Sequence, residues 1–78
     1  MIEVQLTDDH VGKYMNVWTG TMSVSVKIIS VGSGLIGWAV VDSQIPLRSG
    51  KCRYDAQMLY RIYDTADEAM QNKGIQYE

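Results

Sequence analysis

The residue types best suited to chemistry lie around the single cysteine of this 78-residue chain. Cys52 stands between Lys51 and Arg53, and two neighbouring cations favour the thiolate, which is the nucleophilic form of cysteine. His10, the only histidine, is the available general base for such a nucleophile. No motif supplies an oxyanion site or places His10 beside Cys52, so a Cys52/His10 enzyme is the least favoured of our hypotheses. We expect an incidental thiol and no catalytic residue.

Carboxylates adjoin an imidazole at one place, where Asp8, Asp9 and His10 follow one another. A metal site needs ligands that converge on one point at about 2 Å, and adjacent residues rarely converge alone. Neither an Asp-x-Asp-x-Asp-Gly loop nor a His-x-x-x-His pair accompanies them. The sequence therefore predicts a solvated loop at residues 8–10 and no bound metal or cofactor.

Basic residues gather in one short segment of a chain whose formal net charge is -2. Arg48, Lys51 and Arg53 fall within it, and Tyr54 follows them. Cations that contact phosphates, beside an aromatic ring that stacks on a base, are one way to bind single-stranded nucleic acid. Three charges make a small electrostatic footprint, so nucleic-acid binding through this basic loop, residues 48–54, is our alternative hypothesis. A solvated loop, or one that docks on an acidic protein, is favoured over it.

Aromatic residues are the other candidates for a binding surface, because the chain has five Tyr and two Trp but no Phe. Tyr and Trp combine an apolar ring with a polar group and are enriched at protein interfaces. We take Trp18, Trp38 and Tyr63 as candidate protein-interaction residues. The competing interpretation is that these rings pack in the core, and the sequence alone does not separate the two.

The elements that must position these residues centre on a long β-hairpin over residues 21–42. Apolar residues alternate with polar ones up to Gly32-Ser33-Gly34 and resume beyond it. A three-residue loop at 32–34, with Gly34 left-handed, pairs Ile28 with Trp38 and Val26 with Val40. A two-residue loop at 33–34 would place Lys27 opposite Val40 instead. We prefer the first register, which leaves Ser23, Ser25 and Lys27 outside.

The second face of this hairpin is apolar as well, since it carries Ile29, Val31, Leu35 and Val41. We therefore expect it to be covered by the curled chain, by a helix or by another subunit. The break in alternation at Ile28-Ile29, together with nearby glycines, is typical of a bulge or bend where a sheet curls. Residues 11–41 also have the strand rhythm of SH3-like barrels, a likeness of fold that does not fix function.

Three further strands and one helix complete the predicted fold. Alternation predicts strands over residues 2–6, 13–18 and 57–63, while residues 43–55 read as a connecting loop. A short helix is predicted from Thr65 to Lys73, because Thr65 and Glu68 are spaced as a capping box and Gly74 suits the helix end. Ala66, Ala69 and Met70 give this helix a narrow apolar stripe.

The junction from Tyr63 to Met70 resembles the strand-to-helix junction of many small sheet proteins, including antitoxins of the HicB type. That resemblance reflects helix capping, and no function is carried over from it. The predicted class is α+β, predominantly β: a curled antiparallel sheet or small SH3-like barrel of about five strands with one short C-terminal helix.

Length and composition bound the remaining possibilities. The chain is expected to be a single small globular domain over residues 1–78, and a domain of this size buries only about 60% of its unfolded surface, so self-association is expected. One cysteine favours a reducing compartment, and we see neither a signal peptide nor the run of about 18 apolar residues that spans a membrane. We expect a cytoplasmic protein that does not act at a membrane.

Our leading hypothesis is a non-enzymatic interaction module that binds a protein partner and forms a homo-oligomer. This profile is typical of small accessory proteins of phages and mobile elements. Nucleic-acid binding through residues 48–54 remains the alternative, and the sequence names neither the partner nor the biological process.

Overall fold

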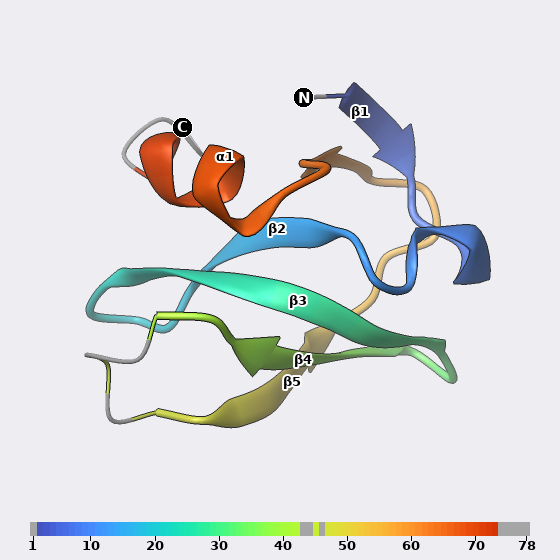
Figure 1. The fold of residues 1–78 in the computed structure, drawn as a ribbon. Coiled ribbons are helices and arrows are strands. Elements are labelled where there is room, and N and C mark those ends of the chain that lie inside the picture. Colours follow the sequence, from blue (N-terminus) through green and yellow to red (C-terminus); the bar gives the residue numbers. More distant parts are fainter. Residues whose placement is uncertain (1, 43–44, 46, 74–78) are drawn as a thin grey trace.

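The computed structural model describes residues 2–42, 45 and 47–73, and it is mostly β with two antiparallel sheets and one short α-helix (Figure 1). In chain order the elements are β1 (Ile2–Gln5), the 3-10 helix η1 (Asp8–His10), β2 (Tyr14–Trp18), β3 (Ser23–Gly32), β4 (Leu35–Val40), β5 (Ser49–Arg53), β6 (Leu59–Ile62) and α1 (Ala66–Gln71). The helix is too short to cross a membrane, and the described residues contain no other α-helix.

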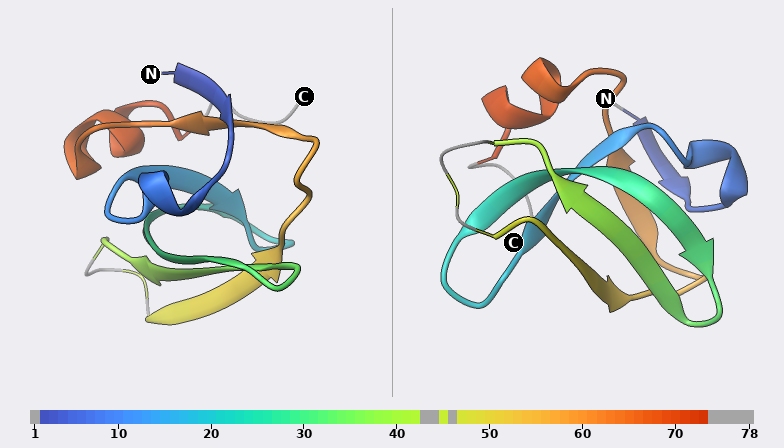
Figure 2. Two further views of the ribbon diagram at one scale, coloured as in Figure 1. Left: turned by 90° about the vertical axis from the view of Figure 1, so that its right-hand side faces the viewer. Right: turned by 60° about the horizontal axis from the view of Figure 1, so that its bottom comes forward.

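The strands form a four-stranded sheet in the order β2-β3-β4-β5 and a two-stranded sheet of β1 and β6. Figure 2 shows the larger sheet curling beneath the pair β1–β6. The two sheets meet where Tyr14 and Tyr63 exchange backbone hydrogen bonds of 3.0 and 2.8 Å. Both sheets are open, and within the described residues no backbone ladder joins β5 to β1.

The β3–β4 hairpin has the predicted residue pairs but not the predicted turn. Ile28 pairs with Trp38 and Val26 with Val40, as expected. The turn itself has two residues, Ser33 and Gly34, both with positive φ, as in a type I′ turn. A register shift between Ile28 and Ser30 leaves Ile29 without a partner. This one-residue bulge restores the predicted pairs beyond it.

The core lies between the two sheets and is built from alternating residues of each strand. The four-stranded sheet contributes Met15, Val17, Val24, Val26, Ile28, Ile36 and Trp38, and the other side contributes Leu6, Tyr60 and Ile62. Trp38 pairs directly with Gly50 of β5, and its ring lies against the glycine. A side chain at position 50 would occupy the space that the indole fills.

The second face of the large sheet is only partly covered, and α1 provides the cover. Asn16 and Ser25 lie side by side on this face and are buried, so the expectation that Ser25 lies outside is wrong. Asn16 Nδ2 donates to the Ala69 carbonyl of α1 at 2.9 Å, and the Ser25 hydroxyl donates to Asn16 Oδ1. The helix therefore covers these two polar residues and accepts a hydrogen bond from Asn16. Farther along, Ile29 and Leu35 stay 51% and 43% exposed.

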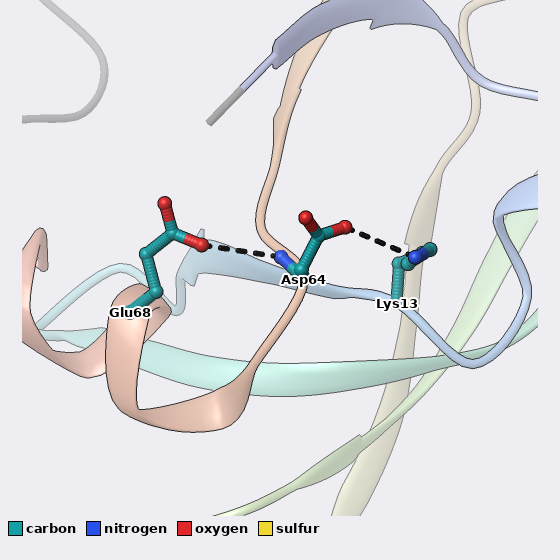
Figure 3. Close-up of polar contacts among 3 residues, drawn as sticks. All are labelled: Lys13, Asp64 and Glu68. Carbon is teal, nitrogen blue, oxygen red and sulfur yellow. Dashed lines mark hydrogen bonds and ion pairs between the residues drawn. The ribbon is translucent and has the colours of Figure 1, made fainter.

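The capping pattern predicted the start of α1, but only half of the capping box forms, because Glu68 reaches back to the amide of Asp64 and not to that of the N-cap Thr65 (Figure 3). Thr65 Oγ1 accepts from the backbone amide of Glu68 at 3.1 Å, and the Glu68 carboxylate accepts from the amide of Asp64 at 3.3 Å. Lys13 Nζ, near the start of β2, donates to Asp64 Oδ1 at 3.0 Å. The helix ends at Gln71 with Asn72 as its C-cap, and the predicted role of Gly74 lies outside the described residues.

One strand was missed by the sequence analysis. Residues 43–55, predicted to be a loop, contain β5, which pairs with β4 from Leu35–Arg53 to Ala39–Ser49. Glycine and charged residues are poor strand formers, so local propensity favoured a loop. The ladder to β4 and the packing of Trp38 on Gly50 override that propensity.

Replacing Gly50 should test this packing. A Cβ at position 50 would lie 2.7 Å from Cη2 and 2.9 Å from Cζ2 of Trp38. Because the indole is rigid and buried, we expect Gly50→Ala to lower the free energy of unfolding by about 1–3 kcal/mol in urea denaturation. The exposed neighbour supplies the control, since Ser49→Ala should change stability by no more than about 0.5 kcal/mol. Equal stability of Gly50→Ala and wild type would contradict the packing of Trp38 on Gly50.

The Lys13–Asp64 pair makes a pH-dependent prediction. The hydrogen bond from Lys13, aided by its charge, holds the pKa of Asp64 below its ordinary value of 3.8. A carboxyl whose pKa is lowered by folding stabilises the fold above its unfolded pKa, and this contribution is lost as pH falls through the folded pKa. In an NMR titration, Lys13→Met should raise the pKa of Asp64 toward 3.8, whereas Lys27→Met should leave it unchanged. A wild-type midpoint at or above 3.8 would exclude the pair as a stabilising contact.

Candidate functional site

An open groove of about 430 Å³ lies at one end of the space between the two sheets. Its size falls within the range of about 300–1,000 Å³ that is usual for binding sites. The lining comes from β2, β5, β6 and the segment that precedes β6, and most of it is apolar. The lining residues are Met15, Val17, Trp18, Cys52, Arg53, Asp55, Met58 and Tyr60.

The floor of the groove is the end of the hydrophobic core. Met15 and Val17 alternate along β2 and point inward with their partners Val26 and Val24. Tyr60 reaches the floor from β6, and its hydroxyl accepts the backbone amide of Asp55 at 3.0 Å. This bond holds the segment before β6 at the edge of the groove, where the Asp55 carboxylate accepts the amide of Gln57.

The rim of the groove exposes large side chains. Trp18, the last residue of β2, is 60% exposed, and Met58 is exposed as well. Arg53 of β5 and Asp55 add opposite charges to the same rim. Trp, Tyr and Arg are the residue types that most often dominate binding energy at protein interfaces, and Met is enriched there too. The arrangement suits an apolar side chain that enters beside Trp18, with polar contacts around it.

Of the three aromatic candidates, the structure places only Trp18 on the surface. Trp38 and Tyr63 are 7% and 3% exposed and pack in the core, where Trp38 covers Gly50 and Tyr63 bonds to the backbone of Tyr14. Their side chains are not available to a partner of the folded chain. Burial of Trp38 follows from the hairpin register, which turns its ring inward together with Ile28.

The basic candidates lie on or beside a strand, where the sequence analysis had placed a loop. Lys51 and Arg53 are exposed on β5, and Arg48 is exposed just before it. Tyr54 is directed elsewhere: its hydroxyl donates to the Leu6 carbonyl at 2.6 Å, and the ring packs against the core. The stacking role predicted for Tyr54 therefore conflicts with its packing.

Cys52 lies on the opposite side of β5 from its charged neighbours. It is partly buried and packs against the core, whereas Lys51 and Arg53 face outward. Burial raises the pKa of the Cys52 thiol, and a weaker influence of the Trp38 indole acts in the other direction. The activation by flanking cations that the nucleophile hypothesis requires is thus outweighed by desolvation. The buried indole N–H of Trp38 lies outside hydrogen-bond geometry to the described acceptors, so its interaction with the Cys52 thiol is weak.

His10 has a local structural role in η1. Its Nδ1 accepts the backbone amide of Thr7 at 3.0 Å, while Thr7 Oγ1 accepts the amide of Asp9. A neutral ring that accepts at Nδ1 carries its proton on Nε2. No hydrogen bond joins His10 to Cys52, and the described residues contain no cluster of three His, Cys, Asp or Glu side chains suited to a metal.

Sequence reasoning missed most of the groove. Met58 and Asp55 were not recognised, because they meet Trp18 and Cys52 only through the tertiary fold. A signal for β5 was present in residues 49–53, where the small residues Gly50 and Cys52 alternate with Lys51 and Arg53. Period-two alternation of this kind marks a strand with one polar face even when its propensity is poor.

Comparisons of the chain with protein-family models, with curated proteins and with solved structures found no match.

The state of Cys52 can be measured directly. Because burial raises the pKa of its thiol, we expect iodoacetamide to alkylate Cys52 at neutral pH more slowly than free cysteine. Unfolding in urea should abolish the difference, and Lys51→Ala should leave the rate nearly unchanged because Lys51 faces outward. Alkylation faster than that of free cysteine would contradict this assignment and revive the nucleophile hypothesis.

Proposed function

We propose that this protein is a non-enzymatic interaction module that binds a segment of a partner protein in the groove beside Trp18. The observation that carries the proposal is the exposure of Trp18 at the rim of an apolar groove. Burial of a tryptophan side chain makes one of the largest contributions of any residue to the binding free energy of a protein interface. In the free chain, the exposed ring of Trp18 does not obtain this contribution. A partner that inserts an apolar side chain beside the ring would recover it.

Nucleic-acid binding is the second candidate, and the exposed cations of residues 48–53 support it. The base-stacking role of Tyr54 is less well supported, since Tyr54 is hydrogen-bonded to Leu6 and packed against the core. Without a stacking ring, binding would depend on phosphate contacts and would fall steeply with salt. Binding that does not weaken with salt would therefore favour the protein-binding groove over nucleic-acid binding.

Self-association is a further part of the proposal. A domain of 78 residues leaves much of its surface unburied, and the exposed Ile29 and Leu35 on the uncovered sheet face support contact between copies. The mass of the protein in solution measures this directly. An entirely monomeric protein at high concentration would remove self-association and leave the groove hypothesis intact.

We also propose that the two sheets represent a small SH3-like barrel that is open on one side. Two contacts support this: the Tyr14–Tyr63 backbone bridge and the hydrogen bond from Tyr54 to Leu6, which spans the gap between β5 and β1. In this interpretation the groove is part of the open side.

The groove hypothesis predicts a strong effect of Trp18. Peptides selected from a random display library on the immobilised protein should bind Trp18→Ala about thirtyfold more weakly, which corresponds to the roughly 2 kcal/mol typical of a dominant interface residue. Because Trp18 is mostly exposed, the variant should keep the wild-type circular dichroism spectrum. Val11→Ala, at an exposed apolar residue outside the groove, is the matched control. Selected peptides that bind Trp18→Ala as tightly as wild type would exclude this groove.

A further inference from the structure

The far edge of β5 is an unpaired strand edge. β5 is last in the strand order, and among the described residues no strand lies along its other side (Figure 1). Val40 donates to the carbonyl of Arg48, and Tyr54 donates to the carbonyl of Gly34. Backbone groups alternate in direction along an antiparallel strand, so Ser49, Lys51 and Arg53 direct their amides and carbonyls away from β4. Such a row is a template for one more strand.

The same edge carries uncompensated positive charge. Arg48, Lys51 and Arg53 are exposed and make no ion pair with any described residue. Three acidic residues elsewhere have cationic partners, in the pairs Asp64–Lys13, Glu3–Arg61 and Asp42–Lys73, and Asp55 on the groove rim forms an ion pair with none of the three edge cations. A strand added at β5 would therefore meet a local positive field, although the whole chain has a net charge of -2.

A second copy of this chain is a poor occupant of the edge. An antiparallel pairing of β5 with itself that used all five residues would be centred on Lys51. Lys51 would then lie opposite the Lys51 of the other copy, and like charges directly opposite each other destabilise a strand pair. The charge pattern instead favours a foreign segment with carboxylates at the positions opposite Lys51 and Arg53.

The two sides of β5 also indicate the side-chain pattern of the foreign segment. Lys51 and Arg53 lie on one side of the strand, while Gly50 and Cys52 lie on the other. Cys52 lines the groove, and Arg53 reaches its rim from the end of the strand. A pairing strand has the same alternation of sides. Residues of the guest strand that fall opposite the cations are two apart, and the residue between them points toward the side of Cys52 and the groove.

We infer that β5 accepts an extended acidic segment of a partner protein as an additional strand, with an acidic–apolar–acidic pattern centred beside Cys52. This inference rests on the proposed function, because the apolar residue of the guest occupies the groove whose rim carries Trp18. Backbone pairing supplies affinity, and the carboxylates opposite Lys51 and Arg53 supply specificity.

A peptide that alternates Glu and Val tests the inference, with a Lys/Val peptide of equal length as its charge-reversed counterpart. Isothermal calorimetry should show that the wild-type protein binds the Glu/Val peptide at least about tenfold more tightly than the Lys/Val peptide. Lys51→Glu/Arg53→Glu should reverse this preference. Lys27→Glu makes the same kind of charge change on β3, away from the edge, and should alter the affinity by less than about threefold.

Amide exchange separates strand addition from simple charge attraction. The amide hydrogens of Lys51 and Arg53 point to solvent in the free chain and should exchange rapidly, then become protected when the Glu/Val peptide binds. An oligothymidylate bound through the lysine and arginine side chains would leave them unprotected. Binding of the peptide without this protection, or tighter binding of the oligothymidylate than of the peptide, overturns the inference.

Two outcomes distinguish this inference from the groove hypothesis on which it rests. If display-selected peptides require Trp18 but are neither acidic nor sensitive to Lys51→Glu/Arg53→Glu, the groove stands and strand addition at β5 fails. If no peptide requires Trp18, the groove hypothesis fails. A Glu/Val peptide that still protects the β5 amides then binds the edge alone, which refutes the joint use of edge and groove by one guest strand.

Discussion

The geometry of this chain depends on one extra residue in β3. The type I′ turn at Ser33-Gly34, continued without interruption, would pair Lys27 with Val40 and turn the apolar side chains of the two arms to opposite faces. The bulge at Ile29 shifts the register so that Ile28 and Trp38 face the core together. Trp38 then lies over Gly50, which seats β5 with Cys52 inward and its cations outward. The inward position of Cys52, which lines the groove, follows from that shift.

Three buried polar side chains show how tightly this small core is constrained. Asn16 and Ser25 are fully enclosed by α1 and are hydrogen-bonded to each other and to Ala69, so their burial is compensated. The indole N–H of Trp38 is buried and poorly satisfied, because its interaction with the Cys52 thiol lies outside hydrogen-bond geometry and sulfur is a weak acceptor. The ring stays there because it fills the space between the hairpin and Gly50. Its apolar contact area outweighs the poorly satisfied donor.

The sequence predicted what alternation and capping determine locally. The strands near residues 2–5, 14–18 and 59–62, the Ile28/Trp38 pair and the Thr65 cap all follow from patterns of a few residues. It failed where tertiary contacts decide. β5 exists because β4 and Trp38 hold a segment of poor propensity. Ser25 is buried because a helix more than forty positions later along the chain supplies the bond to its neighbour Asn16.

The candidate site also combines features set by local sequence patterns with features set by tertiary contacts. That Trp18 ends a strand was predictable, but its exposure depends on where the sheet stops curling, and no local pattern encodes that. The curl leaves β5 and β1 joined by a single hydrogen bond from Tyr54 rather than by a ladder among the described residues. A closed sheet would use the backbone groups of Ser49, Lys51 and Arg53 internally and fill the groove with its own side chains. Because the chain stops short of closure, it retains both a row of unpaired backbone groups and an apolar groove beside it. An added strand would complete the backbone pairing at that edge and cover the groove at the same time.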